Sequence, residues 1–426
     1  MTTEAAPSES SGDAIAVANS RTTSQRQAGG TFRSLKYRDF RLLWFSLLFT
    51  SAGQWFQQIT VGWIVWDLTQ NEFLLGSING FRALPLLLFA PIGGVAADRV
   101  DRKWLLQSTT VLAFASSATL TVIIFADVLE VWHLFAFTFI TGVFWALNNP
   151  VRQSVVPNLV PKHDLMNALA LQSAGFNFTR IIGPSLAGVI LSQIGHAENF
   201  ALQTLAYVGV FLMVVMVTIP PAARANTASI RENLGEGIKF VWSHATLRTQ
   251  LFLALVPPVL AFPYMALMPV FATDVYGKEA TAFGIMGSAV GVGAVIGTLA
   301  IATLNNIERR GILMMGAILL LGISLVAFSQ TKSFELGLVF LALTGLSQMV
   351  FMTTNQTIVQ STTPDQLRGR VMGIYMLGMG LMPLGGLIGG GIAAATSAPT
   401  AVLTMGILVC VLAIGFMARA KNLRGI

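Results

Sequence analysis

The sequence predicts an all-α membrane protein with twelve transmembrane helices in two pseudo-symmetric six-helix bundles. Of its 426 residues, 54% are hydrophobic and only 11% are charged, whereas an average soluble domain contains about 25% charged residues. A span needs about 20 apolar residues, and the strands of a membrane barrel would alternate in polarity, which these runs do not. Twelve suitable segments lie at approximately 42–66, 74–97, 104–126, 132–155, 166–193, 199–219, 250–273, 282–304, 311–329, 335–360, 370–394 and 399–418.

Lysine and arginine are distributed unevenly among the connecting loops. One alternate set of loops and the two chain ends carry most of them, from Arg33 to Arg424, whereas the other set holds only Lys278 and Lys332. Because cytoplasmic loops retain positive charge, both termini are expected to be cytoplasmic, which requires an even number of spans. The net charge of +7 is spread over small clusters and forms no basic stripe, so no nucleic-acid partner is expected.

The chain divides into four parts. Residues 1–33 are rich in Ser, Thr, Ala and Gly, and we expect a disordered cytoplasmic tail. Six-helix bundles are expected at 34–221 and 249–426. Between them, at 222–248, apolar residues recur at spacings of three and four opposite charged ones, which predicts an interfacial amphipathic helix in a cytoplasmic linker.

The two halves of the chain show a sparse internal repeat. A shift of 203 residues without gaps pairs Thr141 and Gly142 with Thr344 and Gly345. Two six-helix halves in parallel repeat are typical of transporters. The other pairs are Gln153 with Gln356, Val156 with Val359, Pro161 with Pro364 and Gly183 with Gly386.

A charged motif lies between the second and third apolar segments. It consists of Gly94, three further residues, Asp98 and Arg99, and then the basic pair Arg102 and Lys103. This motif resembles the loop signature of the major facilitator superfamily, and the span count, topology, linker and repeat extend the resemblance over almost the whole chain. The resemblance implies that these five residues belong to a cytoplasmic gate.

Two further runs resemble one branch of that superfamily, the branch of enterobactin-type siderophore exporters and macrolide efflux proteins. These runs are Arg82–Pro85 in the second segment and Arg180–Pro184 in the fifth. The second half departs from the loop signature, because Ile301 and Ala302 stand where the Asp-Arg pair would be. A latch that uses this acid is therefore expected on one side of the pseudo-symmetry only.

Arg82 and Arg180 are the basic residues furthest from any loop, and Asn79 and Asn177 precede them by three residues, on the same helical faces. A charge at mid-membrane must face protein or a water-filled cavity. One interpretation is a cavity wall that attracts an anionic or oxygen-rich substrate. The alternative is a structural tie to backbone carbonyls.

Three segments carry polar residues that are further candidates for a substrate cavity. The resemblance implies that the first, fourth, seventh and tenth spans line such a cavity. The alternative is hydrogen bonding between helices, worth only about 0.6 to 2 kcal/mol per contact. The candidates are Gln54, Gln57 and Gln58 in the first span, Asn148, Asn149 and Arg152 in the fourth, and Gln348, Asn355 and Gln356 in the tenth.

Several chemistries are not expected. The four histidines and the single cysteine show no metal-ligand spacing, and neither a Walker lysine motif nor a catalytic dyad occurs, so we expect no metal, no cofactor and no enzyme activity. The pairs Gly287 with Gly291 and Gly293 with Gly297 predict close helix packing rather than a nucleotide site. All 19 acidic residues lie in tails, loops or near span ends, so proton coupling rests on the resemblance alone.

Together these observations predict a monomeric secondary active transporter of a bacterial-type plasma membrane. It is expected to move a small organic molecule across the lipid bilayer by alternating access, with export of a siderophore or drug and proton coupling favoured. An importer or a lipid flippase on the same fold is the alternative. A non-transporting membrane receptor or sensor is the rival from another class, and the internal repeat argues against it.

The predicted topology can be tested with reporter tags. Tags after Arg33, within 222–246 or after Arg424 are expected to be cytoplasmic, and tags near Asn71 or Lys332 external, because basic loops remain on the cytoplasmic side. The accessibility of each tag in intact and permeabilised cells measures this. An external signal from the central loop would contradict the two-bundle prediction.

Overall fold

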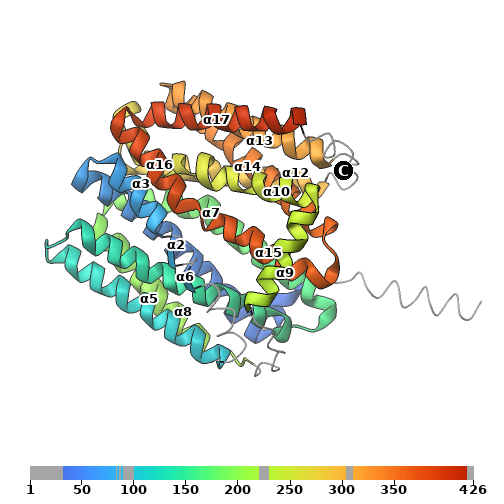
Figure 1. Cartoon of the computed structure of the whole chain (residues 1–426). Helices are drawn as coiled ribbons and strands as arrows, with labels where there is room; N and C mark the ends of the chain where they lie inside the picture. The colour runs from blue at the N-terminus through green and yellow to red at the C-terminus, as the bar shows by residue number, and fades with distance from the viewer. Residues whose placement is uncertain are drawn as a thin grey trace, which may run out of the picture.

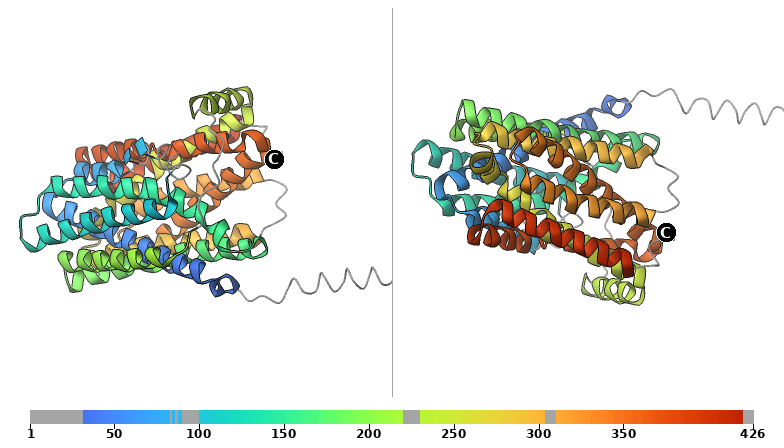
Figure 2. Two further views of the ribbon diagram at one scale, coloured as in Figure 1. Left: turned by 90° about the horizontal axis from the view of Figure 1, so that it is seen from below. Right: turned by 90° about the horizontal axis from the view of Figure 1, so that it is seen from above.

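The computed structural model describes residues 32–82, 84–85, 88–89, 100–219, 230–303 and 310–419. All regular secondary structure in these ranges is helical, as the sequence predicts. The long helices run side by side in roughly one direction (Figure 1). Two further views show that the helix between the halves, α9 (Ile230–Ser243), projects beyond the others near one end (Figure 2).

The helices follow the predicted segments closely. Those of the first half are α2 (Arg38–Thr69), α3 (Glu72–Phe81), α5 (Arg102–Phe125), α6 (Val131–Leu159), α7 (Leu165–Gln193) and α8 (His196–Met216). Those of the second half are α10 (Ala245–Val256), α11 (Pro263–Val270), α12 (Ala280–Thr303), α13 (Arg310–Gln330), α14 (Phe334–Thr362), α15 (Asp365–Met379), α16 (Met382–Ala395) and α17 (Ala398–Arg419). Short helical turns are η1 (Arg33–Lys36), η2 (Lys162–Asp164), η3 (Pro257–Ala261) and η4 (Phe271–Val275).

Ten helical stretches of the described chain are long and apolar enough to cross a membrane. The predicted spans at 42–66 and 74–97 are not among them. Helix α2 covers the first of these, but its three glutamines lower its mean hydropathy. The second lies partly outside the described residues. The prediction of twelve spans therefore stays a prediction.

Two predicted spans are interrupted where proline or glycine disturbs the helix. In the seventh span, α11 is flanked by the π-helical turns η3 and η4. Prolines occur at positions 257, 258, 263 and 269. Proline lacks the N–H that continues a helix, so the hydrogen-bond ladder shifts there. In the eleventh, the chain breaks at Gly380 and Leu381, between α15 and α16, immediately before Pro383.

Glycines bring helices of the two halves into backbone contact along two seams. At the first seam, Gly188 of α7 lies against Gly284 of α12. At the second, Gly76 of α3 lies against Gly386 of α16. In each case a Cβ would collide with backbone atoms of the partner helix. Such close approach is the usual basis of helix association in lipid, where apolar burial gives little driving force.

The glycine pairs of α12 face two different helices. Gly287 and Gly291 contact α7 of the other half, whereas Gly293 and Gly297 contact α14 of the same half. The close packing predicted from these pairs is thus confirmed. Gly345 of α14 completes the second contact, because its Cα lies against the backbone of Val290.

The first described residues, at η1, are held to the connection between α6 and α7. Asp164 is 2% exposed and forms ion pairs with Arg33, at 3.1 Å, and Lys36, at 3.3 Å. The Tyr37 hydroxyl donates to the same carboxylate at 2.7 Å. Arg33 was assigned to the tail by the sequence, but it begins η1 and is bound. A side-chain hydrogen bond from the Lys36 ammonium to Tyr37 is the main cause of a raised pKa at Lys36, and Asp164 adds to it.

Helix α9 divides its apolar residues between two environments. Val241 is buried with Val371 and Tyr375 against the second half, and Arg370 pairs with Glu236. Trp242, which belongs to the same predicted apolar face, is 57% exposed. A helix therefore forms within the predicted linker, and part of its apolar face packs against α15, whereas its placement at a membrane surface stays a prediction.

Substitution of Gly345 by Val tests the packing of α12 on α14. The added side chain meets the Val290 carbonyl, which cannot move without displacing a helix, so we expect a destabilisation of about 1–3 kcal/mol. Gly316→Val is the matched control, because nothing lies within 4 Å of a Cβ at that position. Thermal unfolding of the purified variants measures both. Equal melting temperatures would refute the importance of this contact.

Candidate functional site

A cavity of about 370 Å³ lies between the two halves, roughly midway along the helices. Its walls differ in polarity. The first half contributes most of the polar side chains, and the second half contributes mainly apolar ones. The polar residues are Gln54, Gln58, Asn79, Arg82, Asn149 and, from the second half, Gln348. The apolar wall of the second half includes Phe262, Pro263, Met265, Ala266 and Met382.

Arg82 is the charged residue among the described residues that line this cavity. It follows the last residue of α3, and the helix ends there because Pro85 lacks the N–H that would bond to the Phe81 carbonyl. A cation is favourable at a helix carboxyl end. The guanidinium donates from Nη1 to Gln58 Oε1 at 3.2 Å, which links α3 to α2.

Several buried polar atoms of the cavity wall lack a protein partner within the described part of the chain. They are Gln54 Oε1, Arg82 Nε, Trp145 Nε1 and Gln348 Oε1. A buried polar group without a hydrogen bond is costly, and nearly all such groups in proteins are paired. The wall therefore offers two donors and two acceptors to whatever enters the cavity.

A smaller pocket adjoins the cavity and holds Arg180. It shares Gln58 and Asn79 with the cavity, so the two spaces are continuous in their lining. Arg180 lies on α7, four residues before Pro184, and its carbonyl packs against Gly291 of α12. Both arginines singled out in the sequence thus lie in the same central region, next to a seam between the halves.

The expected residues of the first span are divided between the cavity and the protein interior. Gln54 and Gln58 are four residues apart and share a helical face that lines the cavity. Gln57 points elsewhere: it is 2% exposed, and its Nε2 donates to Thr141 Oγ1 at 2.6 Å. The three glutamines therefore do not form one stripe on the cavity wall, because Gln57 and Gln58 are adjacent in the helix and point about 100° apart.

The fourth span shows the same division. Asn149 lines the cavity, whereas Asn148 and Arg152, four residues apart, share a buried face. Asn148 donates to Thr109 at 2.9 Å, and Arg152 donates to Ser46 Oγ at 2.7 Å. Arg152 also donates to the Leu43 carbonyl and to Asn148 Oδ1. These two residues therefore connect helices rather than line the cavity.

Three other candidates lie outside the cavity lining. Asn355 is fully buried and donates to the carbonyl and side chain of Gln250, which ties α14 to α10. Asn177 is half-buried, and its Nδ2 donates to the Ser173 carbonyl of its own helix at 3.0 Å. Gln356 is half-buried and borders none of the pockets found among the described residues.

The expected gate is described only in part. Gly94, Asp98 and Arg99 lie outside the described residues. Arg102 and Lys103 open α5, whose first turn is capped by the carboxylate of Asp101. Arg102 Nη1 lies 3.4 Å from the Ser154 carbonyl of α6, so the start of α5 is held to its neighbour.

Sequence reasoning missed most of the apolar wall. Phe262, Pro263, Met265 and Met382 carry no chemistry that distinguishes them from lipid-facing residues in a list of apolar segments. The prolines of the seventh span were the available signal, because a broken helix at membrane depth is tolerated only where it is packed by protein or lines a cavity. Trp145 was likewise indistinguishable from an interfacial anchor.

Comparison with known proteins gives a consistent result. The family described as transmembrane secretion effector matches residues 29–424. The staphyloferrin A transporter of Staphylococcus aureus is 28% identical over 79% of this chain and 85% of its own length. The multidrug efflux pump Tap of Mycolicibacterium fortuitum is 24% identical over 90% of this chain and 96% of its own. Macrolide efflux protein A of Streptococcus pyogenes is 25% identical over 82% and 89%, respectively.

Solved structures show the same fold at low sequence identity. The nucleoside transporter NupG superposes with a TM-score of 0.72 at 15% identity, over 90% of this chain and 99% of its own. A bacterial homologue of the human lysosomal transporter Spinster, in an inward-facing and unoccupied conformation, superposes with a TM-score of 0.66 at 15% identity, over 91% and 96%.

Substitutions of Arg152 and Asn177 test which polar residues hold the helices together. Arg152→Gln leaves Ser46 and Asn148 without their partner, so we expect it to destabilise the protein by about 1–3 kcal/mol. Asn177→Ala serves as the control, because this amide donates to a carbonyl of its own helix. Thermal unfolding of the purified proteins measures the difference. An unchanged melting temperature for Arg152→Gln would contradict a connecting role.

Proposed function

Because the chain belongs to the transmembrane secretion effector family of the major facilitator superfamily, we propose that it exports a small organic molecule by alternating access. As a member of this family it is a multi-pass membrane transporter and not an enzyme. The observation that carries the proposal is the central cavity of about 370 Å³, which has a polar wall at mid-length of otherwise apolar helices. The efflux relatives support export as the direction.

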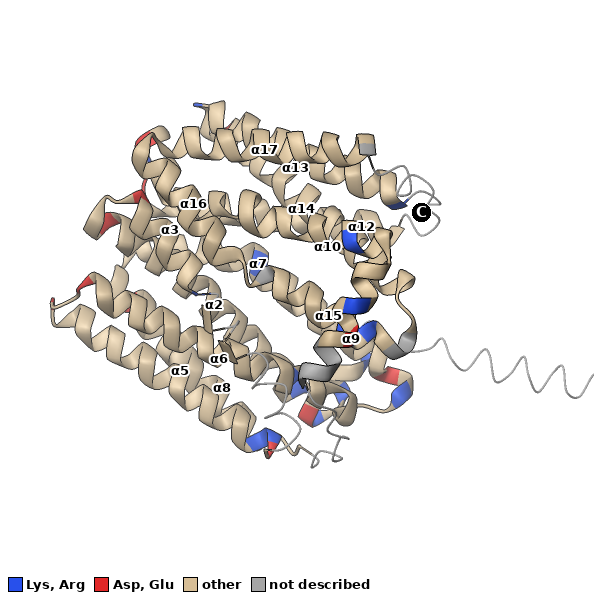
Figure 3. Ribbon diagram, viewed as in Figure 1, with Lys and Arg blue, Asp and Glu red and all other residues tan. Residues whose placement is uncertain are grey.

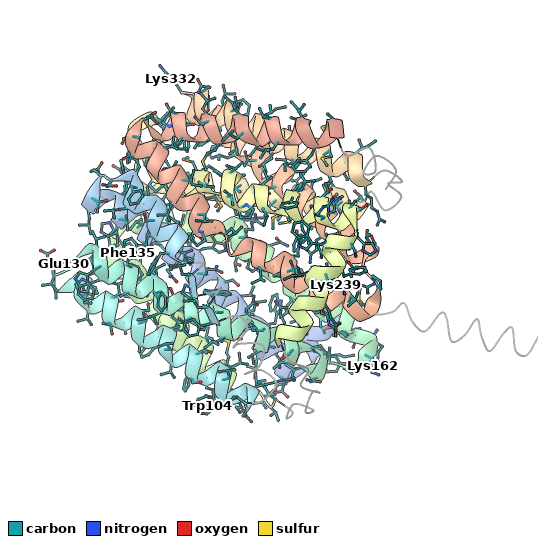
Figure 4. All side chains as sticks on the ribbon, in the orientation of Figure 1. Trp104, Glu130, Phe135, Lys162, Lys239 and Lys332 are labelled. Carbon is teal, nitrogen blue, oxygen red and sulfur yellow. The ribbon has the colours of Figure 1, made fainter. Side chains whose placement is uncertain are left out.

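In the proposed arrangement, two six-helix bundles at 34–221 and 249–426 are joined by the linker 222–248, after the tail at 1–33. The protein works as a monomer in the plasma membrane, with both termini cytoplasmic. The charge distribution supports the proposed orientation in the membrane, because Lys and Arg gather at the end near α9 and α15, and the middle of the ribbon carries few charges (Figure 3). Glu130 and Lys332 lie at the end opposite Lys162 and Lys239 (Figure 4).

Contacts between the halves support alternating access. Trp66 Nε1 donates to Thr273 Oγ1 at 3.0 Å, and Ser185 Oγ donates to Ser288 Oγ at 2.7 Å. With the proposed topology these bonds, and the glycine contacts of both seams, lie toward the external end. The conformation is then inward-facing, like the Spinster homologue. Transport requires that these contacts open as the cytoplasmic ends close.

Export from proteoliposomes tests the proposed function directly. We expect efflux of radiolabelled compounds from a panel of drugs and organic acids, with a rate that increases when a pH gradient is imposed and falls when an ionophore collapses it. Empty liposomes are the control. Absence of flux for every compound would refute the transporter assignment, and flux that ignores the pH gradient would refute proton coupling alone.

A disulfide across the first seam tests alternating access. In a Cys410→Ala background, Ser185→Cys and Ser288→Cys place two thiols where the hydroxyls are 2.7 Å apart. Oxidation is expected to lock the inward-facing form and reduce flux at least tenfold, and a reductant should restore it. The two single cysteine variants are the matched controls. Normal flux through cross-linked protein would show that this seam does not open during transport.

A further inference from the structure

We propose that the cavity binds an amphipathic organic anion, with its carboxylate on Arg82 of the first half and its apolar body against the second half. The inference rests on the proposed export function and specifies the class of substrate. It follows from three features of the described cavity: an uncompensated positive charge, an array of unpaired polar atoms, and a wall that is apolar on one side only.

The charge of Arg82 has no counter-ion in the described structure. Its partner at 3.2 Å is Gln58, a neutral amide, and its Nε is buried without a hydrogen bond. No carboxylate belongs to the described cavity lining. A buried cation in a membrane protein is costly unless it is paired. A ligand carboxylate supplies the missing charge, and it suits the planar guanidinium, which can donate two parallel hydrogen bonds.

A second arginine strengthens the same preference. Arg180 lies in the adjoining pocket, which shares Gln58 and Asn79 with the cavity, and no ion pair to it is present among the described residues. Both arginines are only half-exposed, so salt screens their charges less than those of surface groups, and Arg180 adds to the positive potential around Arg82.

Arg152 shows how this fold holds a structural arginine. Its guanidinium donates to Ser46, to Asn148 and to the Leu43 carbonyl, and it is 3% exposed. Among the described residues Arg82 has a single such bond and lines the cavity, whereas Arg152 lies outside the cavity with three bonds and one unpaired nitrogen, Nη2. The contrast favours a ligand-binding role for Arg82 over a purely structural one.

The other polar atoms and the opposite wall define the rest of the substrate. Trp145 Nε1 is a second unpaired donor, and Gln54 Oε1 and Gln348 Oε1 are unpaired acceptors that suit a hydroxyl or amide of the ligand. Across from them, Phe262 and Met382 belong to the apolar wall of the second half. A small hydrophilic anion would leave this wall without contacts, so the fitting ligand carries an apolar body.

Binding to the unaltered protein gives the first test. The full chain in nanodiscs is dialysed against radiolabelled 4-phenylbutyrate or its uncharged amide, with empty nanodiscs subtracted. We expect the acid to bind at least tenfold more tightly than the amide. Equal affinities, or no binding of the acid at millimolar concentration, would overturn the inference without any mutation.

Variants then locate the charge that is responsible. Arg82→Gln is expected to abolish the preference for the acid, Arg180→Gln to reduce it, and Arg82→Lys to keep part of it, because the positive charge remains without the planar fork. Lys332→Gln makes the same change in charge at an exposed loop and should leave the preference unaltered. A preference that survives in folded Arg82→Gln would overturn the assignment to this residue.

The inference and the proposed function can fail separately. If the protein transports compounds from the panel but binds acid and amide equally, the exporter proposal stands and the anion site is wrong. If the acid binds through Arg82 but nothing crosses the proteoliposome membrane, the anion site stands and the exporter proposal is wrong.

Discussion

Close backbone contact at glycine decides how the helices of this protein are arranged. In lipid, apolar side chains gain little by leaving their surroundings, so helices associate where small residues let their backbones approach. Helix α12 uses two such faces: Gly291 contacts α7 of the other half, and Gly293 contacts α14 of its own half. The cavity lies between the halves, with a wall that includes Gly80 of α3 and Gly386 of α16. The same α3 and α16 form the second seam, so these glycine contacts position Asn79 and Arg82 at the cavity.

Helical class, segment positions and family were predictable because each depends on long averages over the chain. Hydrophobic runs of 20 or more residues and the spacing of basic loops can be recognised even if single residues are misjudged. The comparisons confirm the exporter branch that Arg82–Pro85 and Arg180–Pro184 suggested. The breaks within the seventh and eleventh spans were not predicted. These breaks depend on how α11 and α16 pack, and the number of apolar residues in a segment gives no information about packing.

The candidate site was only partly predictable for a different reason. Composition identifies polar residues in a span, but the rotation of the helix decides which of them reach a cavity. Gln58 and Asn149 face it, whereas their neighbours Gln57 and Asn148 bind other helices. The burial of Asp164 was not predictable either, because its partners Arg33 and Lys36 are distant in sequence and only the fold brings them together.

The unequal walls of the cavity separate two properties that many binding sites combine. In the proposed binding mode, charge recognition rests on the first half, mainly at Arg82, while side chains such as Phe262 and Met382 of the second half set the size and shape of the ligand. Dispersion contacts with an apolar surface are not directional, so exchanges among large and small apolar residues there alter the fit without disturbing the anchor. Substitutions in the apolar wall of the second half could therefore change which substrates fit, while Arg82 in the first half is kept.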